Sequence, residues 1–182
     1  YTKVGYMWIL GGYQNWSTTT PASRLLQGED GLFRGFVNII SDTNGANELK
    51  LCSQYGWSGT NYGIKQGVIN TDVDASNIVL SVGLHYLEFD IDNLKLVDIP
   101  VTKVGLIGEA LGGWDKDYAE LLYNAESNAW IGSAKVTGDK PYKVRLNDSW
   151  EIELDGKKYN ISLGGDNKNL QFGGADLVSK GS

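Results

Sequence analysis

The sequence has 182 residues, a length that suits either one large domain or two small ones. Hydrophobic residues make up 41% and charged residues 21%, which is typical of a folded globular chain and excludes a disordered one. The net charge of −6 argues against nucleic acid or an anionic membrane surface as a partner, because both require a basic protein surface. No stretch approaches about 18 consecutive apolar residues, so no direct membrane insertion is predicted.

The chain contains an internal duplication. Four kinds of segment recur in the same order: an apolar strand with glycine and a loop tryptophan, an aromatic-led strand, a strand with a central lysine, and an Asn-Ile or Asn-Leu pair. The matching segments are 8–16 with 105–114, 31–37 with 128–134, 48–52 with 141–145, and 76–78 with 168–170. The boundary falls near Pro100, which we expect to end a strand, so the two modules span 1–100 and 101–182.

Each module holds several runs of four to eight residues in which apolar and polar residues alternate. In the run 85–91 the odd-numbered residues are apolar apart from His85, which we therefore expect to be a half-buried histidine and not a catalytic base. The segment 116–123 has some helical character, but we expect a turn or a strand there. Short strands separated by glycine-rich turns predict an all-β sandwich.

The second module is shorter at its end than the first. The first continues from 82–84 into a further strand, whereas the second reaches the equivalent point at 180–182. We therefore expect the second module to lack its final strand and the natural chain to continue. A missing strand would leave backbone groups of its neighbour unpaired.

Cys52 is the only cysteine, so no disulfide can form within this sequence. It lies in the alternating run 48–52 and is expected to be a small buried side chain. Neither a cysteine cluster nor a histidine pair is present, and we assign no metal and no cofactor.

The candidate binding residues are aromatic. Sugar rings present flat C–H faces, which bind to exposed aromatic rings flanked by hydrogen-bond donors. Trp16 and Trp114 lie in polar or glycine-rich loops, which favours exposed platforms, although tryptophan is buried on average. Trp57 and Trp150 follow the lysine-bearing strands, where a platform and a cap on the core are equally good interpretations.

Three basic residues accompany these tryptophans. Lys50 and Lys143 lie between apolar neighbours on their strands, so both are expected to point to the solvent face, and Arg145 shares the face of Lys143. An isolated strand lysine usually only solubilises a sheet. Its recurrence beside tryptophan in both modules favours a role in ligand binding.

A glycosidase would need two carboxylates across a cleft, one of them with a raised pKa. The acidic residues near the tryptophans of the second module are Asp115, Asp117, Glu120, Asp148 and Glu151. Small sandwiches rarely enclose the deep pocket that catalysis prefers, and no nucleophile elbow or phosphate-binding loop is present. We therefore expect a binding protein and not an enzyme.

As an ordered set, these motifs resemble the C-terminal modules of SusE/SusF-type outer-membrane lipoproteins, over nearly the whole chain. The segments that carry the resemblance are 105–114, 142–150, 163–170 and, in the first module, 59–63. The resemblance implies two immunoglobulin-like modules that each bind starch-like α-glucan through two aromatics and a basic residue. By position these are Trp16, Lys50 and Trp57, and then Trp114, Trp150 and either Lys143 or Arg145.

The resemblance also implies a surface-exposed location at a bacterial outer membrane, through a lipidated cysteine upstream of Tyr1, and association with a glycan-uptake complex. Members of this family do not all bind starch through every module. The alternative function is a structural spacer, or a module that docks to an outer-membrane glycan transporter without binding sugar.

Overall fold

The computed structural model describes residues 5–20, 22–124, 126–127, 129–166 and 170–180. Their regular structure consists of antiparallel β-strands and two short 3-10 turns, which confirms the predicted all-β class. The chain divides into two compact units, residues 1–100 (unit 1) and 101–182 (unit 2).

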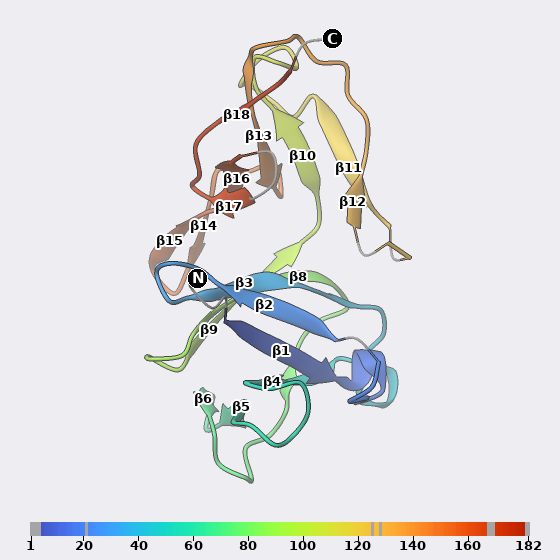
Figure 1. The fold of residues 1–182 in the computed structure, drawn as a ribbon, viewed down its shortest axis with the longest axis vertical. Coiled ribbons are helices and arrows are strands. Elements are labelled where there is room, and N and C mark those ends of the chain that lie inside the picture. Colours follow the sequence, from blue (N-terminus) through green and yellow to red (C-terminus); the bar gives the residue numbers. More distant parts are fainter. Residues whose placement is uncertain (1–4, 21, 125, 128, 167–169, 181–182) are drawn as a thin grey trace. The chain divides into compact units, whose positions relative to one another are not determined.

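Unit 1 is built on a nine-stranded sheet (Figure 1). Its elements are β1 (Tyr6–Gly11), η1 (Gly12–Gln14), β2 (Ser23–Gln27), β3 (Phe33–Ile39), η2 (Thr43–Gly45), β4 (Glu48–Cys52), β5 (Asn61–Lys65), β6 (Val68–Asn70), β7 (Ile78–Val79), β8 (Gly83–Asp90) and β9 (Lys95–Val101). The strand order is β6-β5-β4-β1-β2-β3-β8-β9, and β7 also pairs with β4.

The core of unit 1 lies inside the curve of this sheet. Alternation places Met7 and Ile9 of β1 in the core, together with buried residues from the strands on both sides. The ring of Tyr62 in β5 packs edge-on against Phe89 in β8, with 5.1 Å between the centroids, although four strands separate β5 from β8 in the sheet order. The two ends of the sheet therefore face each other across the core, as the layers of a sandwich do.

His85 in β8 is only 1% exposed, so it is more deeply buried than the half-buried position expected. Its Nδ1 lies 2.6 Å from Asp98 Oδ1 in β9, and its Nε2 lies 2.9 Å from the carbonyl oxygen of Ser81. Burial alone would lower the pKa of His85, but the hydrogen bond and charge of Asp98 outweigh it, and the pKa is raised. His85 is thus a satisfied core residue.

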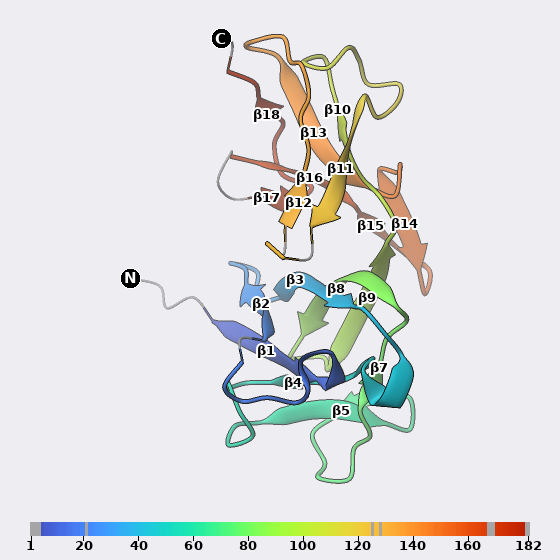
Figure 2. The same cartoon turned by 90° about the vertical axis from the view of Figure 1, so that its right-hand side faces the viewer.

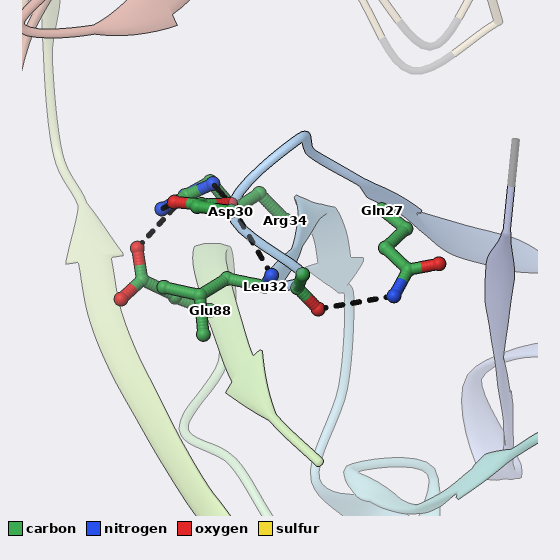
Figure 3. Close-up of polar contacts among 6 residues, drawn as sticks. Gln27, Asp30, Leu32, Arg34 and Glu88 are labelled. Carbon is green, nitrogen blue, oxygen red and sulfur yellow. Dashed lines mark hydrogen bonds and ion pairs between the residues drawn. The ribbon is translucent and has the colours of Figure 1, made fainter. Parts of the chain in front are cut away.

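An ion-paired clamp joins the β2–β3 turn to β8 (Figure 3). Arg34 in β3 donates from Nε to Glu88 at 2.9 Å and from Nη2 to Asp30 at 2.6 Å. Gln27 donates to the carbonyl oxygen of Gly31 across the same turn. The hydrogen bond from Arg34 lowers the pKa of Asp30, so the carboxylate stays charged in mildly acidic solution.

Unit 2 is built on a seven-stranded sheet and a separate hairpin (Figure 2). Its strands are β10 (Val104–Ile107), β11 (Ala119–Asn124), β12 (Ala129–Ile131), β13 (Pro141–Leu146), β14 (Glu151–Leu154), β15 (Lys157–Asn160), β16 (Ser162–Gly165), β17 (Leu170–Phe172) and β18 (Leu177–Val178). The order is β12-β11-β10-β13-β16-β17, and β18 also pairs with β13. Strands β14 and β15 form the separate two-stranded hairpin.

The two units share one strand topology. Reading β10, β11, β12, β13, β16, β17 and β18 as counterparts of β1, β2, β3, β4, β5, β6 and β7 reproduces every pairing of the shared strands. Two glycines show how close the agreement is. A Cβ on Gly63 in β5 would lie 2.3 Å from the carbonyl oxygen of Ser76, and a Cβ on Gly164 in β16 would lie 2.1 Å from that of Ala175. Both units thus need glycine at the place where the segment just before β7 or β18 passes close over the sheet.

This topology corrects one part of the sequence alignment. The expected match between 76–78 and 168–170 is wrong, because β7 pairs with β4 and its counterpart β18 begins at Leu177. The segment 175–177 is therefore the counterpart of 76–78. Leu170 instead opens β17, while residues 168 and 169 lie outside the described residues.

Other expectations about the elements are settled by the same strands. Pro100 does not end a strand, since β9 runs through it to Val101; β9 is the outermost strand of its sheet, where proline is tolerated. The segment 116–123 forms a turn followed by β11, as expected. Unit 2, over its described residues, has no counterparts of β8 and β9.

Candidate functional site

The two predicted tryptophans of unit 1 come from the loops that follow β1 and β4, and their rings lie close together. Asn15 and Trp16 both adopt left-handed backbone conformations after η1, with φ of 56° and 55°, and the amide of Trp16 donates to the carbonyl oxygen of Gly11 at 2.9 Å. Trp57 lies in the loop after β4. The ring centroids of Trp16 and Trp57 are 5.8 Å apart and their planes are tilted by 35°. Trp16 is half-buried, whereas Trp57 is 44% exposed.

Unit 2 brings together its two predicted tryptophans in the same way. Trp114 follows a tight turn in which Gly113 donates to the carbonyl oxygen of Gly108 at 3.0 Å, and Trp150 follows β13. Their centroids are 6.1 Å apart with a tilt of 39°. Trp114 is half-buried and Trp150 is 38% exposed. The second tryptophan of each pair, and not the first as the loop sequences favoured, is therefore the more exposed platform.

The two predicted lysines are not free on the solvent face. Lys50 in β4 donates from Nζ to the carbonyl oxygen of Ala75 at 2.7 Å, and Lys143 in β13 donates to that of Gly174. Both lysines point away from the core, as alternation predicts, but the segment before the last shared strand covers them. The Lys143 side chain is only 14% exposed, with Asp176 at 3.7 Å. The recurrence of lysine in both modules thus has a structural reason.

A hollow of about 480 Å³ opens beside Trp57 in unit 1. Lys50, Asn61 and Asp72 contribute polar groups to its lining. Asn61 donates from Nδ2 to the carbonyl oxygen of Trp57 at 3.1 Å, while its buried Oδ1 has no hydrogen-bond partner. A buried acceptor without a partner costs free energy, so this oxygen is suited to a ligand hydroxyl.

Asn61 was not among the sequence-predicted site residues. Its position follows from the strand register, because Asn61 lies directly opposite Cys52 and so on the same sheet face as Lys50. The missing information was the register of β4 against β5, which the sequence alone does not give.

Arg145 occupies a different position from the lysines. It is 7% exposed, its Nε lies 2.5 Å from Asp117 Oδ1, and its guanidinium carbon lies 5.2 Å from the centroid of the Trp150 ring. Arg145 therefore packs against the ring of Trp150 in a cation–π contact. Among the described residues of unit 2, Arg145 and not Lys143 makes a cation–π contact with the tryptophan pair.

A second carboxyl lies beside this ion pair. Burial, and then a hydrogen bond with Asp148, raises the pKa of Asp117, while hydrogen bonds from Lys103 and from Asp117 lower the pKa of Asp148. Asp117 Oδ2 is buried without a hydrogen-bond partner among the described residues, which fits the raised pKa of this carboxyl.

The remaining predictions concern cysteine, metals and membranes. Cys52 is buried and unpaired, as expected, and burial raises the pKa of its thiol to about 11. Among the described residues, no group of three or more His, Cys, Asp and Glu side chains is arranged to hold a metal ion. The described part of the chain also contains no helix with the length and apolar character needed to cross a membrane.

Comparisons of this chain with protein-family models, with curated proteins and with solved structures give no match. The interpretation of the site therefore depends on its own geometry and on the sequence motifs.

Proposed function

We propose that this chain is a non-catalytic polysaccharide-binding protein whose two units each bind a sugar on a tryptophan pair. The observation that carries the proposal is the repetition of one arrangement. In both units a half-buried and an exposed tryptophan lie about 6 Å apart with a tilt of 35° to 39°. Exposed aromatic rings held in a fixed arrangement offer flat faces on which sugar rings can stack, which suits a glycan chain.

The resemblance to SusE/SusF-type modules supports starch-like α-glucan as the ligand, and with it an immunoglobulin-like fold for each unit. It also supports an outer-membrane location through an upstream lipidated cysteine, with glycan capture as the task. In unit 1, Lys50 and Asn61 would supply a donor and an acceptor to sugar hydroxyls beside Trp57. In unit 2, Arg145 would hold Trp150 in place.

Each site is shallow and open, so the affinity of one unit for a short oligosaccharide should be weak. Two units on one chain raise the affinity for a polymer through effective concentration when both bind the same molecule.

The test is affinity electrophoresis of the full chain in native gels cast with amylopectin, pullulan, dextran or levan. We expect retardation by amylopectin and pullulan. Trp57→Ala and Trp150→Ala should each reduce the affinity about tenfold, as loss of a binding hot spot does, and the double variant should migrate as in a gel without glycan. Trp130→Ala is the matched control, because Trp130 packs on Tyr123 in the β11–β12 hairpin and belongs to neither pair.

Retardation by dextran or levan alone would retain the binding function and change the sugar. Equal retardation of the double variant and the parent would refute the tryptophan sites. No retardation in any gel would favour the spacer or the transporter-docking function.

A further inference from the structure

Unit 1 carries a second group of aromatic rings on the outer face of its sheet. Met7 and Ile9 of β1 point into the core, so Tyr6 and Trp8 point to the opposite face. On the neighbouring strand β2, Arg24 lies directly opposite Trp8 and is exposed. Tyr6 is 37% exposed, and Trp8 is half-buried.

These side chains form one stack. Tyr55, from the loop after β4, lies with its ring centroid 4.8 Å from that of Trp8, and the ring centroid of Tyr6 lies 6.1 Å from that of Trp8. Successive rings are tilted by 39° and 38°. The Arg24 guanidinium lies 4.4 Å from the Tyr6 centroid and 5.6 Å from that of Trp8. The Tyr55 hydroxyl donates to the carbonyl oxygen of Thr20, which fixes the ring in place.

The stack is continuous with the candidate site. Tyr55 and Trp57 lie two residues apart in one loop, and the first packs on Trp8 while the second packs on Trp16. The strand register gives the same result, because Trp8 lies opposite Cys52, whose outward neighbour on β4 is Lys50.

The described residues of unit 2 do not form such a stack. Gly105 pairs with Arg145 as Trp8 pairs with Cys52, so Gly105 is the counterpart of Trp8. A Cβ on Gly105 would lie 2.1 Å from Asp117 Oδ2, and the ion pair of Asp117 with Arg145 therefore occupies the space above this glycine. The stack is thus a feature of unit 1 and not a requirement of the shared fold.

We propose that Tyr6, Trp8, Tyr55 and Arg24 form an additional sugar-binding subsite of unit 1, which holds the part of a neutral oligosaccharide that extends beyond Trp16 and Trp57. The inference rests on the proposed function. Aromatic faces flanked by a planar donor suit the C–H faces and hydroxyls of sugars. The tilt of the rings repeats that of the tryptophan pair, so one curved chain can follow both. Unit 1 would then prefer long oligosaccharides, and unit 2 would not.

The experiment uses the full chain with Trp150→Ala, so that only unit 1 binds. Isothermal titration with maltotriose and maltoheptaose compares this parent with versions that also carry Tyr6→Ala, Tyr6→Phe or Arg24→Ala. We expect Tyr6→Ala and Arg24→Ala to lower the affinity for maltoheptaose about fivefold while leaving maltotriose within about twofold, and Tyr6→Phe, which keeps the ring, to resemble the parent. Arg24→Ala changes an exposed side chain, so it remains informative if Tyr6→Ala fails to fold.

Parent-like binding of maltoheptaose by both alanine variants would overturn the subsite. An equal loss for both sugars would overturn it too, since it would place these residues in the tryptophan site. Adding Trp57→Ala to this parent tests the proposed function separately from the subsite. If the proposed function holds, this variant should bind neither sugar, whether or not the subsite exists. A parent that binds neither sugar would overturn both.

Discussion

Unit 1 and unit 2 share one strand topology but stabilise it by different means. Of the twelve largest fully buried side chains among the described residues, ten lie in unit 1, and only Ile107 and Leu146 lie in unit 2. Unit 1 has β8 and β9 beyond β3, whereas in the described part of unit 2 the sheet ends with β12 as its edge strand, and Leu122 and Ile131 are exposed. Unit 2 instead buries an ion pair beneath Trp150. The fold that carries the tryptophan pair therefore has mainly apolar support in unit 1, from its core, and additional charged support in unit 2, from the Arg145–Asp117 ion pair.

The largest expected effect tests the apolar support of unit 1. Phe89 in β8 is fully buried and packs on Tyr62, so Phe89→Ala should lower the free energy of unfolding of unit 1 by about 3–5 kcal/mol. Urea denaturation followed by tryptophan fluorescence would measure it. Leu122→Ala, at a side chain 68% exposed in unit 2, should change stability by no more than about 0.5 kcal/mol. A loss of similar size in both variants would contradict the contrast between the units.

The next effect tests the charged support of unit 2. Arg145→Met leaves Asp117 buried without its cation, and we expect a loss of about 3 kcal/mol in the stability of unit 2 near neutral pH. Cys52→Ala, at the equivalent position of unit 1, removes one small apolar group and should cost about 1 kcal/mol. The raised pKa of Asp117 adds a further condition: the cost of Arg145→Met should shrink in acid, where Asp117 becomes neutral.

A second variant tests the ion pair without removing either of its charges. Gly105→Ala keeps both charges but places a methyl group where Asp117 Oδ2 lies, so it should also destabilise unit 2. If Gly105→Ala and Arg145→Met both left the unfolding of unit 2 unchanged, the ion pair would have no supporting role.

Local patterns were sufficient to predict the all-β class and the burial of Cys52 from the sequence. Alternation along a strand fixes which side chains share a face, so it correctly placed Lys50 and Lys143 on the side away from the core. It could not show that a later segment of the chain covers both lysines. Asn61 was missed for the same reason, because its place beside Lys50 depends on strand register.

The alignment error has a related physical origin. Residues 76–78 and 168–170 both contain an Asn before an aliphatic residue, but such short pairs are common in turns and do not report strand pairing. Only the pairing of β18 with β13 identifies the true counterpart. The burial of Trp16 and Trp114 is likewise decided by long-range contact with Trp57 and Trp150, which no local pattern contains.

The smallest expected effect depends on pH and again separates the units. His85 is the only histidine, and both of its ring nitrogens face acceptors, Asp98 Oδ1 and the carbonyl oxygen of Ser81. Its pKa is raised in the folded state, so the stability it contributes is fully present below its ordinary value of 6.5 and is lost as the pH rises through the folded value. We expect the free energy of unfolding of unit 1 to decrease as the pH rises above 6.5, by at most about 1.4 kcal/mol per pH unit. The midpoint temperature of unfolding should decrease with it.

Thermal unfolding of the full chain at several pH values between 6 and 8 measures this slope, and unit 2, which has no histidine, is the internal control. Asp98→Asn removes the charge that raises the pKa of His85, so this variant should be less stable at pH 6 and should lose most of the slope. A slope of equal size in both units, or one that persists in Asp98→Asn, would show that another group titrates. If Asp98→Asn removes the pH dependence of unit 1, the β8–β9 hairpin is among the elements that set the stability of unit 1. Unit 2 lacks this hairpin over its described residues.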